Sequence, residues 1–79
     1  MGNELLARIT IDPEVMVGKP VIRGTRVPVD LILRLLSKGL STDEVLEDYP
    51  QLKKEDIQAA LLYGAEVIIA PVSLYFEAL

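Results

Sequence analysis

The clustering of glycine and proline between positions 18 and 28 constrains the fold more than any other feature. The segment reads Gly-Lys-Pro-Val-Ile-Arg-Gly-Thr-Arg-Val-Pro. Because glycine frees the backbone to turn and proline fixes φ and lacks an N–H, an uninterrupted helix cannot run through it. The enclosed Val21-Ile22 pair suits a short strand. Residues 8–11 alternate polar and apolar before the turn pair Asp12-Pro13, so Ile9 and Ile11 are predicted to pair with Val21 or Ile22.

The pattern becomes helical after Pro28. One apolar stripe at helical spacing predicts the first main helix, formed by Leu31, Ile32, Leu35 and Leu36. Gly39 is well placed as the residue that follows the helix end in a left-handed conformation. Leu33 falls off the stripe, which makes it a candidate for a second buried face.

The second main helix has a clear start and end. Ser41 and Glu44 stand at the spacing of a capping box, in which each side chain bonds the other residue's backbone N–H. The helix must end by Tyr49, because Pro50 disfavours the helical conformation at the residue before it.

A third main helix begins near Lys53 and is expected to end or kink at Pro71. Its predicted buried stripe consists of Ile57, Leu61, Gly64, Ala65 and Ile68. Gly64 costs about 1 kcal/mol against alanine in mid-helix, so we expect another helix to approach closely there. The chain is thus divided into a hairpin and three-helix domain over 1–70 and an apolar tail over 71–79.

Composition excludes several classes of function. The 79 residues suffice for one small domain, and 51% are apolar, so we expect part of that surface to be covered by a partner or a second copy. The chain has no His, Cys or Trp, which excludes disulfide scaffolds, zinc fingers and imidazole or thiol catalysis. No serine has a histidine partner for nucleophilic catalysis. We therefore expect no enzyme activity, no metal and no cofactor.

The sequence also bears on location. It shows no basic segment leading into an apolar one at the start, and its apolar runs are far too short to span a bilayer. The expectation is a soluble, cytoplasmic protein with no membrane partner.

Charge is distributed unevenly along the chain. Residues 1–40 contain six basic and four acidic residues, whereas residues 41–79 contain two basic and eight acidic ones. The formal net charge of −4 argues against nucleic-acid binding, but a local basic face in the first half can still meet a duplex.

Two other kinds of site are disfavoured. Gly18-Lys19 lacks both the upstream glycine and the following Ser or Thr of a phosphate-binding loop. An acidic group at the start of the second helix could suggest a cation site, but negative charge stabilises a helix N-terminus in any case. We interpret this group as a solvated, cap-stabilising face; it comprises Asp43, Glu44, Glu47 and Asp48.

The spacing of the last two helices is typical of a helix-turn-helix. In that arrangement Lys53 and Lys54 could contact phosphates and Gln58 could bond adenine in the major groove. Glu55 and Asp56 on the same turn would repel phosphates, and an ordinary three-helix core remains the alternative.

Arg23 and Arg26 flank Gly24-Thr25 in an expected exposed turn. They could reach a duplex or an acidic partner, or merely confer solubility or pair with Asp30.

The segment from Gly18 to Val29 carries the pattern Gly-x-Pro-x-Ile-x-Gly-Thr-Arg-Val-x-Val. It resembles the signature of the domain of unknown function 433 family of bacteria and archaea, and the likeness extends over about residues 8–68. In physical terms the glycines and prolines shape the turns, while Thr25 and Arg26 are expected to supply polar anchors between the hairpin and the first main helix.

The resemblance implies a mainly α, homeodomain-like helix-turn-helix bundle of three helices with a small N-terminal β-hairpin, present as a dimer. It also implies a VapB-type antitoxin that binds operator DNA and neutralises a PIN-like nuclease toxin. The expected toxin contacts are Leu74, Tyr75, Phe76 and Leu79, and the expected dimer contacts are Ile9, Ile11, Val21, Ile22 and Leu33. The tail could instead fold back on its own core or swap across the dimer. A protein-interaction module that does not bind DNA is the alternative function.

Overall fold

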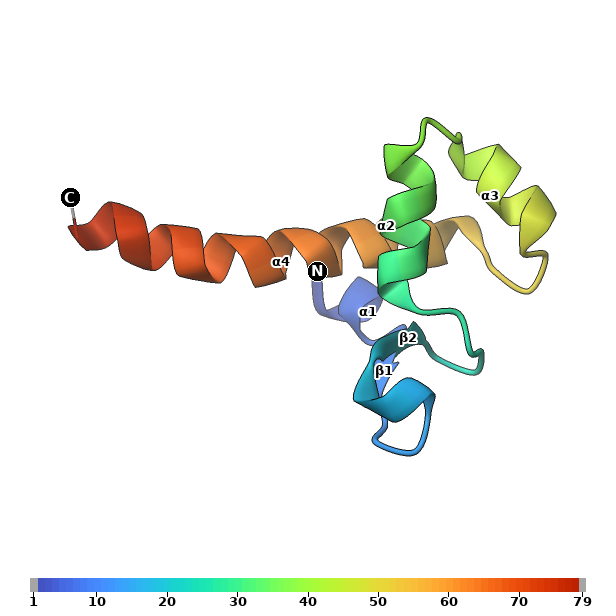
Figure 1. The fold of residues 1–79 in the computed structure, drawn as a ribbon, viewed down its shortest axis with the longest axis horizontal. Coiled ribbons are helices and arrows are strands. Elements are labelled where there is room, and N and C mark those ends of the chain that lie inside the picture. The colour runs from blue at the N-terminus through green and yellow to red at the C-terminus, as the bar shows by residue number, and fades with distance from the viewer. Residues whose placement is uncertain (1, 79) are drawn as a thin grey trace.

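The computed structural model describes the backbone of residues 2–78 and the side chains of residues 4–67. The chain is mainly helical, as expected, and its helices accompany one two-stranded antiparallel sheet (Figure 1). In chain order the elements are α1 (Gly2–Leu6), β1 (Ile9–Ile11), the short 3-10 helix η1 (Met16–Gly18), β2 (Pro20–Ile22), α2 (Val29–Ser37), α3 (Thr42–Asp48) and α4 (Lys54–Ala78).

The hairpin forms within the chain. Ile9 lies opposite Ile22, which confirms the predicted hairpin and the pairing of Ile9. The predicted pairing of Ile11 with Val21 or Ile22 is wrong, because in this register Ile11 lies opposite Pro20 and Thr10 opposite Val21. Gly18 and Gly24 both adopt φ of +79°, a backbone conformation that side-chain-bearing residues rarely adopt. These two glycines let the chain turn before and after β2, so that the strand can pack against the helices.

The three main helices enclose the core. α2 crosses α4 and also packs against α3, while the hairpin lies below them in Figure 1. The buried apolar cluster consists of Ile22, Val27, Val29, Ile32, Val45, Leu52, Ile57 and Ala60. The short helix α1 also packs against α4, with Leu5 and Leu6 half-buried. Five residues are too few to display a helical period, which is why the sequence gives no signal for α1.

The C-terminus of α2 confirms the role expected for Gly39. Its φ is +94°, and its N–H donates to the carbonyl of Leu36 at 3.0 Å. The N–H of Leu40 donates to the carbonyl of Leu35 at 3.4 Å. Together these two bonds form a Schellman motif, which satisfies carbonyls at the helix end and stops the helix.

The predicted capping box at the start of α3 is also confirmed. The N–H of Glu44 donates to the Ser41 hydroxyl at 3.2 Å, and the N–H of Ser41 donates to the Glu44 carboxylate at 3.0 Å. Hydrogen bonding of the Glu44 carboxylate to Ser41, to its backbone N–H foremost and then to its side chain, holds the pKa of Glu44 below its ordinary value. The helix ends at Asp48, before Pro50, as predicted.

α4 extends further than predicted. It begins at Lys54 as expected. Of the two predicted outcomes at Pro71, an end or a kink, the end is wrong, because the helix continues through Pro71 to Ala78. A proline removes only one hydrogen-bond donor from the helix, and its fixed φ is compatible with the helical conformation. The remaining hydrogen bonds of a 25-residue helix can therefore maintain the helix beyond Pro71. The segment 71–78, which we assigned to a separate tail, continues the helix. None of the described helices has an apolar stretch long enough to cross a membrane.

Gly64 marks the crossing point of α2 and α4. A Cβ atom at this position would lie 3.1 Å from Cδ1 of Leu33. The expected close approach of another helix is therefore confirmed, and Leu33 does form a second, half-buried face of α2.

Candidate nucleic-acid interface

Two turns from different parts of the chain meet on one side of the molecule. One joins β2 to α2 and the other joins α3 to α4. Two adjoining hollows lie there, and Thr25 and Gln51 line both of them. Arg23 and Lys53 also line the first, whose volume is about 470 Å³. Arg26 lines the second. We call these five residues the basic turn surface. The fold thus brings together three of the five side chains predicted to bind DNA.

Thr25 fixes the shape of this surface. Its hydroxyl donates to the carbonyl of Ile22 at 2.7 Å and accepts from the N–H of Val27 at 3.0 Å. Its expected role as a polar anchor is confirmed. Among the described residues, no hydrogen bond or ion pair involves the side chain of Arg26, so the anchoring expected of Arg26 is not found there. Its exposed guanidinium projects from a turn that Thr25 holds rigid.

Arg23 combines exposure with a structural contact. Its Nε donates to the carbonyl of Ala7 at 2.9 Å, and its backbone N–H donates to the carbonyl of Arg8 at 2.7 Å. The alternative that Arg23 or Arg26 pairs with Asp30 is wrong. Asp30 instead has Lys19 at 3.5 Å and Arg34 at 3.9 Å.

The Asp56 carboxylate is not free to repel phosphates, contrary to the expectation from the sequence. It is only 5% exposed, and its two oxygens accept from Arg8 Nε at 2.8 Å and from the Lys53 N–H at 2.9 Å. The carboxylate is therefore compensated by a cation and by the first turn of α4. Sequence reasoning missed Arg8, because a partner 48 residues away leaves no local pattern.

The other two predicted DNA contacts lie elsewhere. Lys54 and Gln58 are exposed on the first turns of α4, in a groove whose other wall is the start of α3. Ser41, Thr42 and Asp43 form that wall. The fold thus separates the five candidate residues into the basic turn surface and this α3–α4 groove, on either side of the N-terminus of α4.

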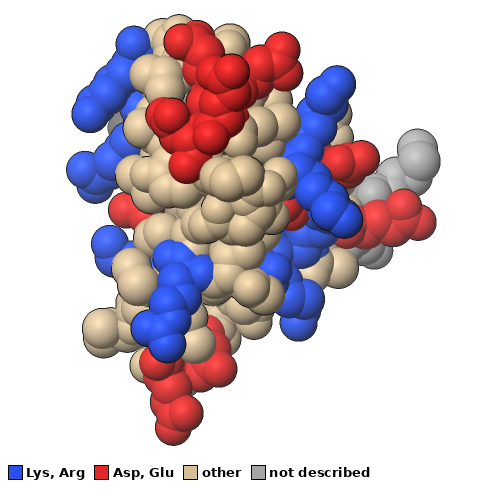
Figure 2. Space-filling model, turned by 90° about the vertical axis from the view of Figure 1, so that its right-hand side faces the viewer, with Lys and Arg blue, Asp and Glu red and all other residues tan. Residues whose placement is uncertain are grey.

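Acidic side chains gather at the end of the molecule that also contains the basic turn surface and the α3–α4 groove. Figure 2 views that end and shows them at the top centre, with basic side chains at both edges and below. The acidic residues of α3 are all exposed, in agreement with their interpretation as a solvated face; they are Asp43, Glu44, Glu47 and Asp48. Within the described part of the chain, acidic side chains form no group that could hold a metal ion.

The residues expected at partner interfaces are distributed unevenly. Val21 and Ile22 are buried in the chain's own core, Ile9 and Leu33 are half-buried, and Ile11 is 57% exposed. The expected toxin contacts are Leu74, Tyr75, Phe76 and Leu79. The side chains of the first three and the whole of Leu79 lie outside the described part of the chain.

Known proteins resemble this chain over most of its length. The sequence profile of the family described as "Protein of unknown function (DUF433)" matches residues 9–64. An uncharacterised protein of Sinorhizobium fredii is 40% identical over 56 residues, which are 71% of this chain and 25% of that protein. An uncharacterised protein of Archaeoglobus fulgidus is 57% identical over 30 residues, which are 38% of this chain and 83% of that protein.

A solved structure shares the fold. The crystal structure of a DUF433 member protein from Anabaena variabilis superposes with a TM-score of 0.73 at 36% identity, covering 81% of this chain and 63% of the other. This chain spans a quarter of the Sinorhizobium protein's length, so it corresponds to one part of that larger protein. The profile match includes the hairpin, α2, α3 and the first part of α4. The chain therefore belongs to the DUF433 family.

Proposed function

We propose that this chain is a DNA-binding antitoxin that binds operator DNA as a dimer and neutralises a PIN-like nuclease toxin. One observation carries the DNA-binding part. α3 and α4 are joined by a short turn and backed by α2, and exposed Lys54 and Gln58 stand on the first turns of α4 beside the basic turn surface. The antitoxin part rests on the resemblance of the signature segment to that family.

In this arrangement different residues contact the phosphates and the bases of the DNA. Exposed cations at Arg26 and Lys53 are placed to contact phosphates, which fix orientation but carry no sequence information. Gln58 stands one turn beyond Lys54 on α4, and a glutamine amide can make two hydrogen bonds to adenine in the major groove. The burial of Asp56 against Arg8 compensates one of the nearby carboxylates that would repel a phosphate, while Glu4 and Glu55 stay exposed.

The acidic face of α3 limits how DNA can approach. Asp43 lines the groove that holds Lys54 and Gln58, so a phosphate on that side would meet repulsion. The duplex backbone therefore has to run over the basic turn surface, on the other side of the α4 N-terminus. In this orientation α3 lies over the major groove of the DNA rather than against its sugar-phosphate backbone.

The direct test is fluorescence anisotropy with a labelled duplex from upstream of the chain's own gene. An unrelated duplex of equal length serves as control, and both are titrated at low and near-physiological salt. Tight binding to the first duplex alone supports the proposal. Equal binding to both that salt abolishes indicates only phosphate contact. Absence of binding, with and without the neighbouring gene's product, contradicts the DNA-binding part.

Removing two cations from the basic turn surface should weaken binding to every duplex. We expect Arg26→Ala with Lys53→Ala to lower the magnitude of the slope of log K against log salt by about 4 for a bound dimer, since each of the two copies loses two phosphate contacts and each contact accounts for about 0.9. Arg34→Ala with Lys38→Ala is the matched control, because it removes the same charge from exposed positions on and after α2. Equal losses for the two double variants would point to net charge alone.

Gln58→Ala should act on sequence preference rather than on overall affinity. Loss of a bidentate contact to adenine is expected to reduce discrimination between the upstream and unrelated duplexes by about 1–3 kcal/mol. Binding to the unrelated duplex and the salt slope should stay as in the parent chain. A uniform loss on both duplexes would instead place Gln58 among the phosphate contacts.

A second candidate function is a protein-interaction module that does not touch DNA. The observation that favours it is the exposed acidic face of α3 within a chain of net charge −4. Titration with the neighbouring gene's product separates the two: binding of that product without DNA binding in any combination favours the module.

A further inference from the structure

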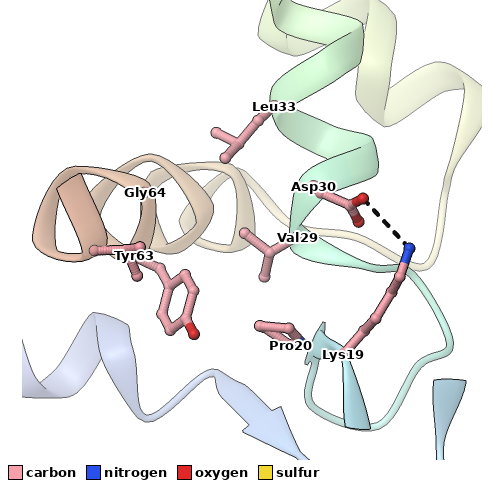
Figure 3. A pocket seen from close by; sticks show the side chains of 8 residues that line it. Lys19, Pro20, Val29, Asp30, Leu33, Tyr63 and Gly64 are labelled. Atoms are coloured by element: carbon pink, nitrogen blue, oxygen red, sulfur yellow. Dashed lines mark ion pairs between the residues drawn. The ribbon is translucent and has the colours of Figure 1, made fainter. Parts of the chain in front are cut away.

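An apolar groove runs between α2, β2 and α4 (Figure 3). Its volume is about 390 Å³. Its walls are Pro20, Val29, Leu33, Tyr63, Gly64 and Val67, with the Lys19–Asp30 ion pair at one edge. Val67 lines it while remaining 54% exposed. No part of the described chain fills this groove, although it is large enough to accept several aliphatic side chains.

The same helix that forms one wall of the groove continues well beyond it. Figure 1 shows α4 projecting from the body of the molecule, away from α2 and α3. We call residues 68–78 the distal segment of α4. The sequence from Val67 to Phe76 contains no charged residue. A helix without a polar face requires burial, and an isolated segment of this length is not stable in water.

We propose that two copies of this chain pair through α4, with the distal segment of each copy lying in the apolar groove of the other. The groove and the distal segment are adjacent on one helix, and Val67 belongs to the boundary between them. When two such helices run antiparallel about a twofold axis near this boundary, each distal segment is brought to the partner's groove. A twofold interface requires one patch that complements itself, and in this pairing the groove and the uncharged distal segment are the two complementary parts of that patch.

This interface differs from the dimer contacts expected from sequence. It uses Leu33, which lines the groove, but not the four hairpin residues expected there, Ile9, Ile11, Val21 and Ile22, of which Val21 and Ile22 are already buried within the chain. It also accounts for Gly64 and Val67, because a bulkier or charged residue at either position would obstruct the groove. The proposal concerns pairing of the chain and stands independently of DNA binding.

The oligomeric state tests the proposal through two matched variants of the full chain. Val67→Glu places a carboxylate in the groove, whereas Leu61→Glu adds the same charge at a residue of similar exposure, 51%, outside the groove on the same helix. Sedimentation equilibrium should show a dimer for the parent. Val67→Glu is expected to raise the dimer dissociation constant at least about tenfold, because an unpaired carboxylate would be buried. Leu61→Glu should leave it unchanged. A monomeric parent chain, or equal effects of both variants, would overturn the proposal.

Cross-linking tests which segment occupies the groove. The chain lacks cysteine, so Lys19→Cys in one preparation and Ser73→Cys in another provide single attachment points at the groove edge and in the distal segment. A short bismaleimide should join the two preparations when mixed, and Val67→Glu in both should suppress this product. Dimers that yield no mixed product would place the interface elsewhere. A DNA-binding defect with dimerisation intact would count against the proposed function and leave this inference standing.

Discussion

Asp56→Ala is expected to lower the free energy of unfolding by about 2–3 kcal/mol. The carboxylate is 5% exposed and joins two distant parts of the chain, Arg8 before β1 and the Lys53 N–H at the start of α4. Removing it leaves a partly buried guanidinium and a helix N–H without their acceptor. Because the Arg8 side chain is 33% exposed, water can recover part of the loss, which places the expected value below that of a fully buried pair.

Urea denaturation of the parent and variant measures this effect. Glu55→Ala is the matched control, since it removes an exposed carboxylate from the same helical turn and should change stability by less than about 0.5 kcal/mol. A double-mutant cycle with Arg8→Ala should reveal a coupling energy of about 1 kcal/mol or more, because the two side chains are in direct contact. An Asp56→Ala variant as stable as the Glu55→Ala control would show that the ion pair adds nothing to the fold.

The features predicted correctly from sequence are those specified by neighbouring residues. The capping box at Ser41 and Glu44, the left-handed Gly39 and the hairpin all depend on contacts within a few positions or on one simple pairing. The close helix approach at Gly64 is predictable because a mid-helix glycine is costly without one. Interactions between residues close in sequence therefore make these features predictable without the tertiary structure.

Features set by distant contacts escaped prediction. The pairing of Arg8 with Asp56 spans 48 residues, and α1 has too few residues to show a period. Local sequence predicts an end or a kink of α4 at Pro71, because proline breaks a helix locally, whereas a long helix tolerates the loss of one hydrogen bond and continues to Ala78. In each case the sequence contains the residues involved but not their spatial relation.

The candidate interface shows the same division. The sequence identified Arg23, Arg26 and Lys53 by charge and exposure, yet it could not tell that they surround one pair of hollows. Thr25 and Gln51 join them there, and Gln51 gave no signal because a single glutamine in a turn is unremarkable as a pattern. Helical spacing places Lys54 and Gln58 with the other candidates, but in the fold they line a separate groove.

Ile32→Ala is expected to lower the free energy of unfolding by about 3 kcal/mol. Ile32 is 0% exposed at the centre of the cluster that joins α2 to the rest of the core. Truncation removes three buried carbon atoms and leaves a cavity, because the backbones of packed helices cannot collapse fully into the space. In a small domain of marginal stability this loss is a large fraction of the total.

The matched comparison is Leu35→Ala, which removes as many carbons from the same apolar stripe at a half-buried position. Helical spacing alone treats Ile32 and Leu35 as equivalent, so it predicts equal losses. The structure predicts a clearly smaller loss for Leu35, because water already reaches part of its side chain. Urea midpoints with unchanged m-values decide between these expectations. Equal destabilisation would mean that a further surface, such as a second copy of the chain, covers Leu35 as completely as the core covers Ile32.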